Sequence, residues 1–277
     1  MEITMENLRV AFPAPSGELL PAVRGVSLTL GREKLGIVGE SGSGKSLTAR
    51  SILRLLPRQA IVTADRLEYG ASSLLGCSDA AMREIRGKKI GFIMQDPKFS
   101  LNPVMTIGAQ IAESFRVHYS RSHKAAAETA LESLAQVQIR DPNRVARLYP
   151  HEVSGGMGQR AMIAMMLAAD PDVLIADEPT ASLDVSVQSG ILKLIDDLVT
   201  SRGMSLILIS HDLPMVSRFC DRVIVMYAGR VVEELAAKDL MSAQHPYTRG
   251  LLHCLPSFAR VTRRLPTITR DPSWLSQ

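Results

Sequence analysis

"GESGSGKS", residues 39–46, lies between a short apolar stretch at Leu35–Val38 and a helical pattern at Lys45–Leu55. These eight residues match G-x-x-x-x-G-K-[ST] in full, with the strand before them and the helix after them that this motif requires. The glycines let backbone N–H groups turn toward phosphate oxygens, and the start of a helix adds a favourable dipole. Lys45 is expected to reach the β- and γ-phosphates and the Ser46 hydroxyl to bind Mg²⁺. The sequence therefore predicts a nucleoside triphosphate site rather than a flexible Gly/Ser loop.

The rest of the chain alternates between strand-like and helix-like stretches, which indicates a parallel sheet with covered faces. Strand signals vanish between residues 97 and 160, so this stretch is expected to be a helical insertion. Residues 223–233 are expected to form a closing hairpin, and the chain after residue 244 an irregular tail. The expected strands are residues 3–10, 23–30, 35–38, 90–94, 173–176, 206–209 and 223–227, and the expected helices after the insertion are 186–202 and 213–219.

Composition and charge exclude several classes of protein. The 277 residues carry a net charge of +4 and 4% aromatic residues, too little of either to indicate binding of nucleic acid. Three cysteines without a C-x-x-C spacing indicate a reducing compartment rather than disulfides or a zinc site. The longest strongly apolar run, residues 161–169, is far short of the roughly 20 residues of a membrane-spanning helix. The N-terminus has no signal-peptide pattern.

Two further stretches are candidates for chemistry. In "PDVLIADEPT" an apolar strand ends in Asp177 and Glu178, where ligands gather in parallel sheets. Asp177 suits a Mg²⁺ partner and Glu178 a base that polarises the attacking water, although a solvated turn is the alternative for this stretch alone. In "HEVSGGMGQR" the residues Ser154, Gly155 and Gly156 open a predicted helix and form a second place for an anion.

GESGSGKS, Gln95 after IGFIM, SGGM, VLIADEP, SLD and SHD follow one another in this order. Over residues 3–256 the chain resembles the ATP-binding subunits of ABC transporters. The resemblance implies an α/β fold: a P-loop NTPase (RecA-like) core with an antiparallel β subdomain and an inserted α-helical subdomain. It divides the chain into residues 1–95 and 161–244 of the core, a helical subdomain at 96–160 and a tail at 245–277.

The resemblance also implies roles for single residues. Gln95 touches Mg²⁺ and the lytic water, His211 contacts the γ-phosphate, Asp184 communicates across a dimer interface, and Phe12 stacks on adenine. Mg²⁺ is expected at Ser46, Gln95 and Asp177, and catalysis is expected from Glu178, His211 and Gln95. The expected ATP-binding set is Phe12, Gly39, Glu40, Ser41, Gly42, Ser43, Gly44, Lys45, Ser46 and Leu47.

In such proteins two ATPase domains pack head to tail, so the signature Ser154, Gly155, Gly156 and Met157 is expected to serve the ATP of the partner. Met157 stands where Gln is common, and Val153 where Leu is usual. Gly158 costs about 1 kcal/mol of helix propensity against Ala. The hydroxyl and both glycines of the signature nevertheless remain.

"DPKFSLNPVMT", "YPHEVSGGM" and "HPYTRGLLHCLP" resemble the peptide/nickel importer branch. This implies two transmembrane permease subunits, a second, non-identical ATP-binding subunit and, indirectly, an extracytoplasmic solute-binding protein. The place of action is the cytoplasmic face of the plasma (inner) membrane, with Phe99–Ile107 and the helices after it facing the membrane subunit. With Cys254 alone in the tail, no iron–sulfur cluster is expected. The arginines of the tail could meet lipid headgroups or be solvated: Arg260, Arg263, Arg264 and Arg270.

The cargo is expected to be a small peptide, with nickel or an opine as the alternative. A DNA-repair or chromosome ABC ATPase would need a long coiled coil or zinc modules, and a translation factor of this type would need two cassettes. A GTPase would need an NKxD motif, which the sequence lacks. A subunit that gates without hydrolysis is disfavoured by Lys45, Asp177, Glu178 and His211, although Gly158 keeps it open for the partner's site.

Overall fold

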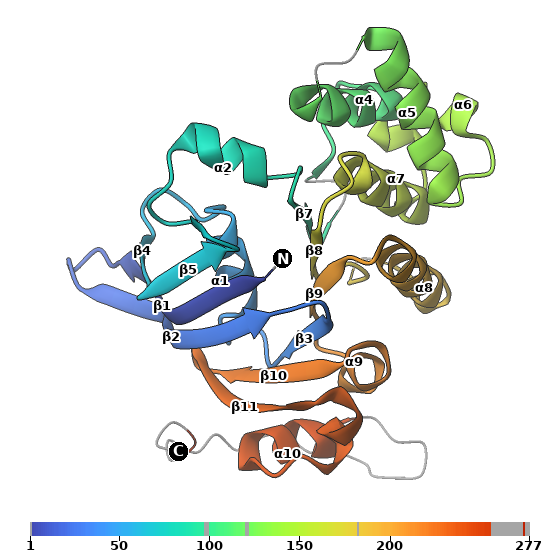
Figure 1. The fold of residues 1–277 in the computed structure, drawn as a ribbon. Coiled ribbons are helices and arrows are strands. Elements are labelled where there is room, and N and C mark those ends of the chain that lie inside the picture. The colour runs from blue at the N-terminus through green and yellow to red at the C-terminus, as the bar shows by residue number, and fades with distance from the viewer. Residues whose placement is uncertain (1, 97–99, 120–121, 182, 256–273, 275–277) are drawn as a thin grey trace. The chain divides into compact units, whose positions relative to one another are not determined.

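The structure, a computed structural model, describes residues 2–96, 100–119, 122–181, 183–255 and 274 (Figure 1). The chain forms two compact units. Unit 1 comprises Met1–Gly76 and Ile207–Gln277, and unit 2 comprises Cys77–Leu206. The chain thus leaves unit 1 once and returns to it once, and unit 2 is a continuous insertion.

Unit 1 contains an antiparallel sheet in the order β2-β1-β5-β6, with β4 also paired to β1. Alternation along β1 places Ile3 and Met5 in the core, and then Leu8 and Val10 after a register shift between Met5 and Leu8, so the burial has a period of two on either side of that shift. The three strands that the sequence did not indicate have only two to four residues, too few for a pattern. The strands are β1 Ile3–Pro13, β2 Leu19–Leu30, β4 Ile61–Thr63, β5 Arg66–Tyr69 and β6 Ser72–Ser73.

The remaining strands of unit 1 follow the order β11-β10-β3-β9. Strands β3 and β10 are parallel, with Leu35 opposite Arg222 and Val38 opposite Val225, and β10 and β11 form the expected antiparallel hairpin. These elements are β3 Lys34–Val38, α1 Lys45–Ile52, β9 Ser205–Ile209, α9 Leu213–Phe219, β10 Arg222–Tyr227 and β11 Arg230–Ala236.

The expectation of an irregular chain after residue 244 is wrong for its first part. A 3-10 helix, η2 Ala237–Ser242, precedes a helix, α10 Pro246–His253, beside β11 (Figure 1). Proline fits the first turn of a helix, and the Nδ1 atom of His245 accepts the Tyr247 N–H at 3.2 Å. The burial of Tyr247 holds this short helix on the unit. Arg260, Arg263, Arg264 and Arg270 lie outside the described residues.

Unit 2 contains parallel strands in the order β9-β8-β7, since β9 begins in this unit. Between β7 and β8 its described residues form only helices and turns. Ser and Thr begin three of these helices, because the hydroxyls of Thr106, Ser122 and Ser154 each accept an N–H three residues on. The elements are α2 Asp79–Ile85, β7 Ile90–Ile93, α4 Ile107–His118, α5 His123–Gln136, α6 Pro142–Val145, η1 Pro150–Glu152, α7 Gly155–Leu167, β8 Val173–Asp177 and α8 Val185–Arg202.

Helices α4, α5 and α7 pack against one another, as the green and yellow ribbons of Figure 1 show. The Tyr119 hydroxyl after α4 donates to the Ala169 carbonyl at 2.9 Å, and Arg160 of α7 donates to the Val137 carbonyl at 2.7 Å. Among the residues that the structure describes, no helix combines the length and the hydropathy needed to cross a bilayer.

Candidate functional site

The phosphate loop of unit 1 has a backbone that glycine permits. Gly39, Gly42 and Gly44 have φ values of +147°, +82° and +99°, which other residues adopt only with strain. A Cβ on Gly39 would also lie 2.2 Å from the Met226 carbonyl oxygen of β10. One on Gly44 would lie 3.1 Å from the carbonyl oxygen of Ala22. Neighbouring strands therefore fix the course of the loop.

The side chain of Lys45 lies inside this loop and bonds to its backbone. Its Nζ atom donates to the carbonyl oxygens of Gly39 and Glu40, both at 2.8 Å, and to the Ser43 Oγ at 3.4 Å. The side chain is 5% exposed, so a cation is held within a cradle of backbone groups. Ser46 is the second residue of α1, directly after Lys45, and is half-buried. A buried cation at the start of a helix is an arrangement that attracts phosphate.

Two further expected residues belong to unit 1. His211 follows β9, the neighbour of β3, and is exposed. The Ser210 N–H next to it donates to the Ile37 carbonyl at 3.2 Å, so His211 follows β9 at the end where β3 leads into the phosphate loop. Phe12 lies half-buried near the end of β1, opposite Leu20 of β2, which is 53% exposed. This pair leaves apolar surface open beside the β1–β2 turn.

The acidic strand end of unit 2 joins two residues that lie 83 positions apart in the sequence. Asp177 ends β8 and is 1% exposed, and Glu178 follows with a φ of +47°. Strands β7 and β8 are in parallel register, with Ile93 opposite Ala176, so Gln95 emerges beside Glu178. The Gln95 Nε2 atom donates to the Glu178 Oε2 atom at 3.3 Å. A positive φ at a non-glycine residue is strained, and such strain gathers at functional sites.

The signature forms the start of α7. The Ser154 Oγ accepts the Met157 N–H at 3.4 Å, and Ser154 and Gly155 are exposed. A Cβ on Gly156 would lie 3.0 Å from the Val187 Cγ1 of α8, so the first turns of α7 and α8 approach closely here. Because the glycines have no side chains, the backbone at the N-terminal end of α7 stays accessible.

Asp184 occupies the position before α8, where its carbonyl accepts the N–H groups of Val187 and Gln188 at 2.8 and 3.0 Å. The Gln188 side chain was missed by the sequence interpretation. Its Nε2 atom donates to the carbonyls of Thr180 and Leu183 at 3.1 and 3.0 Å and so holds the turn between β8 and α8. The available signal was an amide one turn after Asp184.

Tyr247 was also missed, because it fell in the predicted tail. Its hydroxyl accepts the Glu40 N–H of the phosphate loop at 3.0 Å. The backbone N–H of Glu40 is therefore engaged by the protein, and the Ser41 and Gly42 residues after it are exposed.

The donor groups fit a nucleotide with its magnesium ion. Mg²⁺ prefers a few protein oxygens together with phosphates and water. Asp177 offers a buried carboxylate and Ser46 a hydroxyl, the types of ligand that this ion takes. The described part of the chain holds no group of three or more His, Cys, Asp or Glu side chains suited to a metal.

A phosphate loop in one unit, and a strand end with paired carboxylate and amide in the other, define a P-loop nucleotide-hydrolysing protein. The family model described as "ABC transporter" matches residues 23–181. The chain is 53% identical to a "Probable peptide ABC transporter ATP-binding protein" of Sinorhizobium fredii over 239 residues, which covers 85% of this chain and 71% of the relative. It is 47% identical to a "Dipeptide transport ATP-binding protein" of Bacillus subtilis, covering 92% and 76%.

Among solved structures, a dimeric ATP-binding cassette in a post-hydrolysis state with ADP and phosphate matches at a TM-score of 0.74 and 28% identity. The match covers 85% of this chain and 98% of that one. The chain belongs to the ABC transporter family and has its ATPase fold, and it is an ATP-binding, ATP-hydrolysing subunit.

Proposed function

We propose that the chain drives the import of small peptides by binding and hydrolysing ATP. The observation that carries the cargo class is the identity of 45–53% to proteins named for peptide or dipeptide transport, over 85% or more of this chain. The chain supplies the ATPase, and the membrane subunits of the transporter supply the path for the peptide.

The proposed chemistry divides among few residues. Backbone N–H groups of the phosphate loop and Lys45 hold the phosphates. Ser46, Gln95 and Asp177 would hold Mg²⁺, which would neutralise phosphate charge. Glu178 polarises the attacking water, and its contact with Gln95 orients the carboxylate for this task. His211 contacts the γ-phosphate. Charge stabilisation and positioning supply most of the catalysis, since phosphoryl transfer needs little covalent chemistry.

A second, non-identical ATP-binding subunit completes the assembly. The exposed Ser154 and Gly155 at the start of α7 serve the ATP of this partner, because a helix N-terminus offers unpaired N–H groups to a phosphate. Asp184 lies exposed at the start of α8, whose first turn packs against the signature. It communicates between the two subunits.

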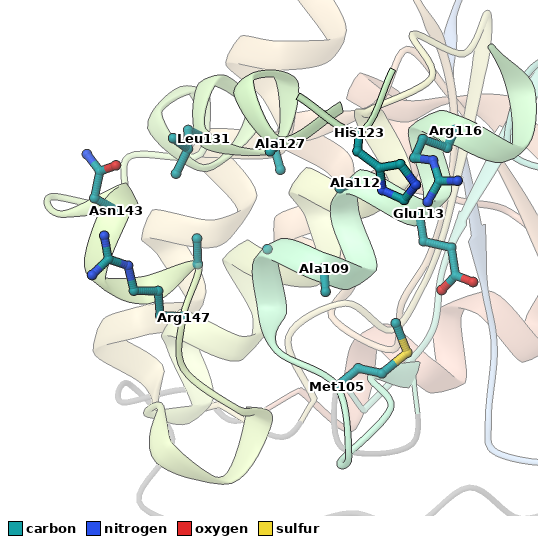
Figure 2. A pocket seen from close by; sticks show the side chains of 13 residues that line it. Met105, Ala109, Ala112, Glu113, Arg116, His123, Ala127, Leu131, Asn143 and Arg147 are labelled. Atoms are coloured by element: carbon teal, nitrogen blue, oxygen red, sulfur yellow. The ribbon is translucent and has the colours of Figure 1, made fainter. Parts of the chain in front are cut away.

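A pocket of about 520 Å³ in unit 2 is proposed as the docking site for a membrane subunit. Figure 2 shows Glu113, Arg116 and His123 at one end of the pocket and Asn143 with Arg147 at the other. Small side chains leave the space between these polar ends: Gly108, Ala109, Ala112, Ala127, Ala130 and Ala146. An apolar side chain of a cytoplasmic helix fits the middle and polar groups fit the rims, as between docked domains. Docking here places the chain peripherally at the cytoplasmic face of the membrane.

The test is Glu178→Gln in the assembled transporter, with Glu128→Gln on an exposed turn of α5 as the matched control. We expect Glu178→Gln to lower ATP hydrolysis about 10²- to 10⁴-fold, as for loss of a general base, while Mg·ATP still binds. Hydrolysis at the parent rate would contradict the role of Glu178. In light scattering the isolated Glu178→Gln chain should remain monomeric with Mg·ATP bound. A dimer of this chain alone would overturn the non-identical partner.

A further inference from the structure

Helix α10 reaches the phosphate loop through one side chain. Tyr247 is completely buried, and its hydroxyl accepts the Glu40 N–H at 3.0 Å. Its ring lies 4.5 Å from the ring of Tyr227 and 5.6 Å from that of Trp274, measured between centroids. Aromatic packing of this kind fixes where the hydroxyl points. The contact joins residues 207 positions apart, both within unit 1.

The turn that begins α10 is itself anchored on β11. The Glu233 Oε1 atom accepts the N–H groups of Gln244 and His245 at 2.8 and 3.1 Å, and His245 accepts the Tyr247 N–H. Burial acts to raise the pKa of Glu233, but the nearby Thr248 hydroxyl and the hydrogen bonds from the two N–H groups lower it overall. The carboxylate is therefore charged at neutral pH and binds the turn firmly. Strand β11 thus supports the position of Tyr247.

The bond to Tyr247 uses an atom that Lys45 does not. Lys45 binds the carbonyl oxygens of Gly39 and Glu40, and its ammonium group is also the one proposed to bind phosphate. The Glu40 N–H bonds to the Tyr247 hydroxyl, so this contact does not involve the lysine. This hydrogen bond therefore holds the Glu40 N–H whether or not Lys45 also binds a phosphate. A loop that is held in advance loses less freedom on binding.

We propose that Tyr247 is a positioning residue of the nucleotide site, which holds the Glu40 peptide in the phosphate-binding form of the loop. The inference rests on the proposed role of this loop in binding Mg·ATP. It assigns the Glu40 N–H to Tyr247 rather than to a phosphate, whereas the sequence alone placed Glu40 among the nucleotide contacts.

The experiment compares Tyr247→Phe with Tyr227→Phe in the full chain, using titration calorimetry with Mg·ATP. Both changes remove one hydroxyl from the same aromatic cluster, but the described residues provide no hydrogen bond for the Tyr227 hydroxyl. We expect Tyr247→Phe to weaken binding about three- to tenfold, as for one lost hydrogen bond. The KM for ATP in the assembled transporter should rise by the same factor, with kcat changed less than about twofold, because a positioning residue of the binding loop acts before chemistry. Tyr227→Phe should bind like the parent.

Parent-like binding by Tyr247→Phe would overturn the inference, as would an equal loss in both variants. Thermal unfolding without nucleotide distinguishes positioning of the loop from a purely structural role. If Tyr247→Phe unfolds at the parent midpoint, it must still bind Mg·ATP more weakly than the parent. Lys45→Ala tests the nucleotide site itself. If it binds Mg·ATP as tightly as the parent, the proposed function of the loop fails. If it loses binding while Tyr247→Phe does not, only the inference about Tyr247 fails.

Discussion

Gly39→Ala tests whether close approach to β10 is what requires glycine at the start of the phosphate loop. The new Cβ would lie 2.2 Å from the Met226 carbonyl oxygen, whereas ordinary contacts begin at 3.4 Å. One of the two backbone segments must therefore move by about 1.2 Å, because repulsion rises steeply at such distances. The φ of +147° adds strain of about 1–3 kcal/mol. Overpacking costs a further amount of about 1–3 kcal/mol.

The expected loss of unfolding free energy is therefore about 2–6 kcal/mol for Gly39→Ala. Gly17→Ala is the matched control, because Gly17 has a φ of +85° but nothing lies within 4 Å of the position that a Cβ would take there. It should lose only the strain, about 1–3 kcal/mol. Urea unfolding without nucleotide measures both, followed by fluorescence of Trp274, the single tryptophan of the chain, which lies 5.5 Å from Tyr227 in unit 1. Equal losses within about 0.5 kcal/mol would refute the argument from close approach.

Three other substitutions probe the packing of the units. The pKa of Glu33 is lowered from 4.5, chiefly by its hydrogen bond from Arg222 and against the effect of burial. The pair therefore stabilises the folded chain above about pH 4.5, and this stabilisation is lost as the pH falls further. Arg222→Met should therefore lower the free energy of unfolding by about 1–3 kcal/mol in urea at pH 7. The difference in this free energy between variant and parent should shrink below pH 4.5, and a difference independent of pH would contradict the argument. Gly108→Ala should destabilise unit 2 by about 1–3 kcal/mol, because the added Cβ would lie 2.7 Å from that of Ala146. Gly190→Ala within α8 should stabilise unit 2 by about 0.5–1 kcal/mol, since its nearest atom is 3.9 Å away. Amide hydrogen exchange in the helices of unit 2 distinguishes the last two, and the same sign for both would contradict the geometry.

The sequence predicted what depends on neighbouring residues and missed what depends on distant ones. The phosphate loop could be recognised because strand, glycines, lysine and helix follow one another within a short stretch. Short strands such as β4 and β6 depend on pairing with partners for their existence, so they leave little local signal. Helix α10 was missed because the burial of Tyr247 stabilises it more than its own short pattern does.

The same distinction applies to the site. Asp177 and Glu178 could be placed at a strand end from the sequence, and Gln95 received its role from resemblance. Their contact needed the parallel register of β7 and β8, which no local pattern contains. Gln188 and Tyr247 act through hydrogen bonds to backbone groups, and any residue type can supply such a backbone partner. Their importance is therefore invisible until the chain is folded.

The two helix starts that we propose to bind phosphate differ in how much of their backbone the protein restrains. Around the loop before α1, glycine contacts, the bonds of Lys45 and the bond to Tyr247 all restrict the backbone without nucleotide. At the start of α7, Ser154 and Gly155 are exposed, and the hydroxyl of Ser154 makes a bond of 3.4 Å to its own helix. A restricted loop loses little freedom when it binds, and an exposed helix start gains most from a phosphate brought by another molecule. We therefore expect ATP to bind first to the loop of a single subunit, and the signature to engage only when a partner presents its own ATP.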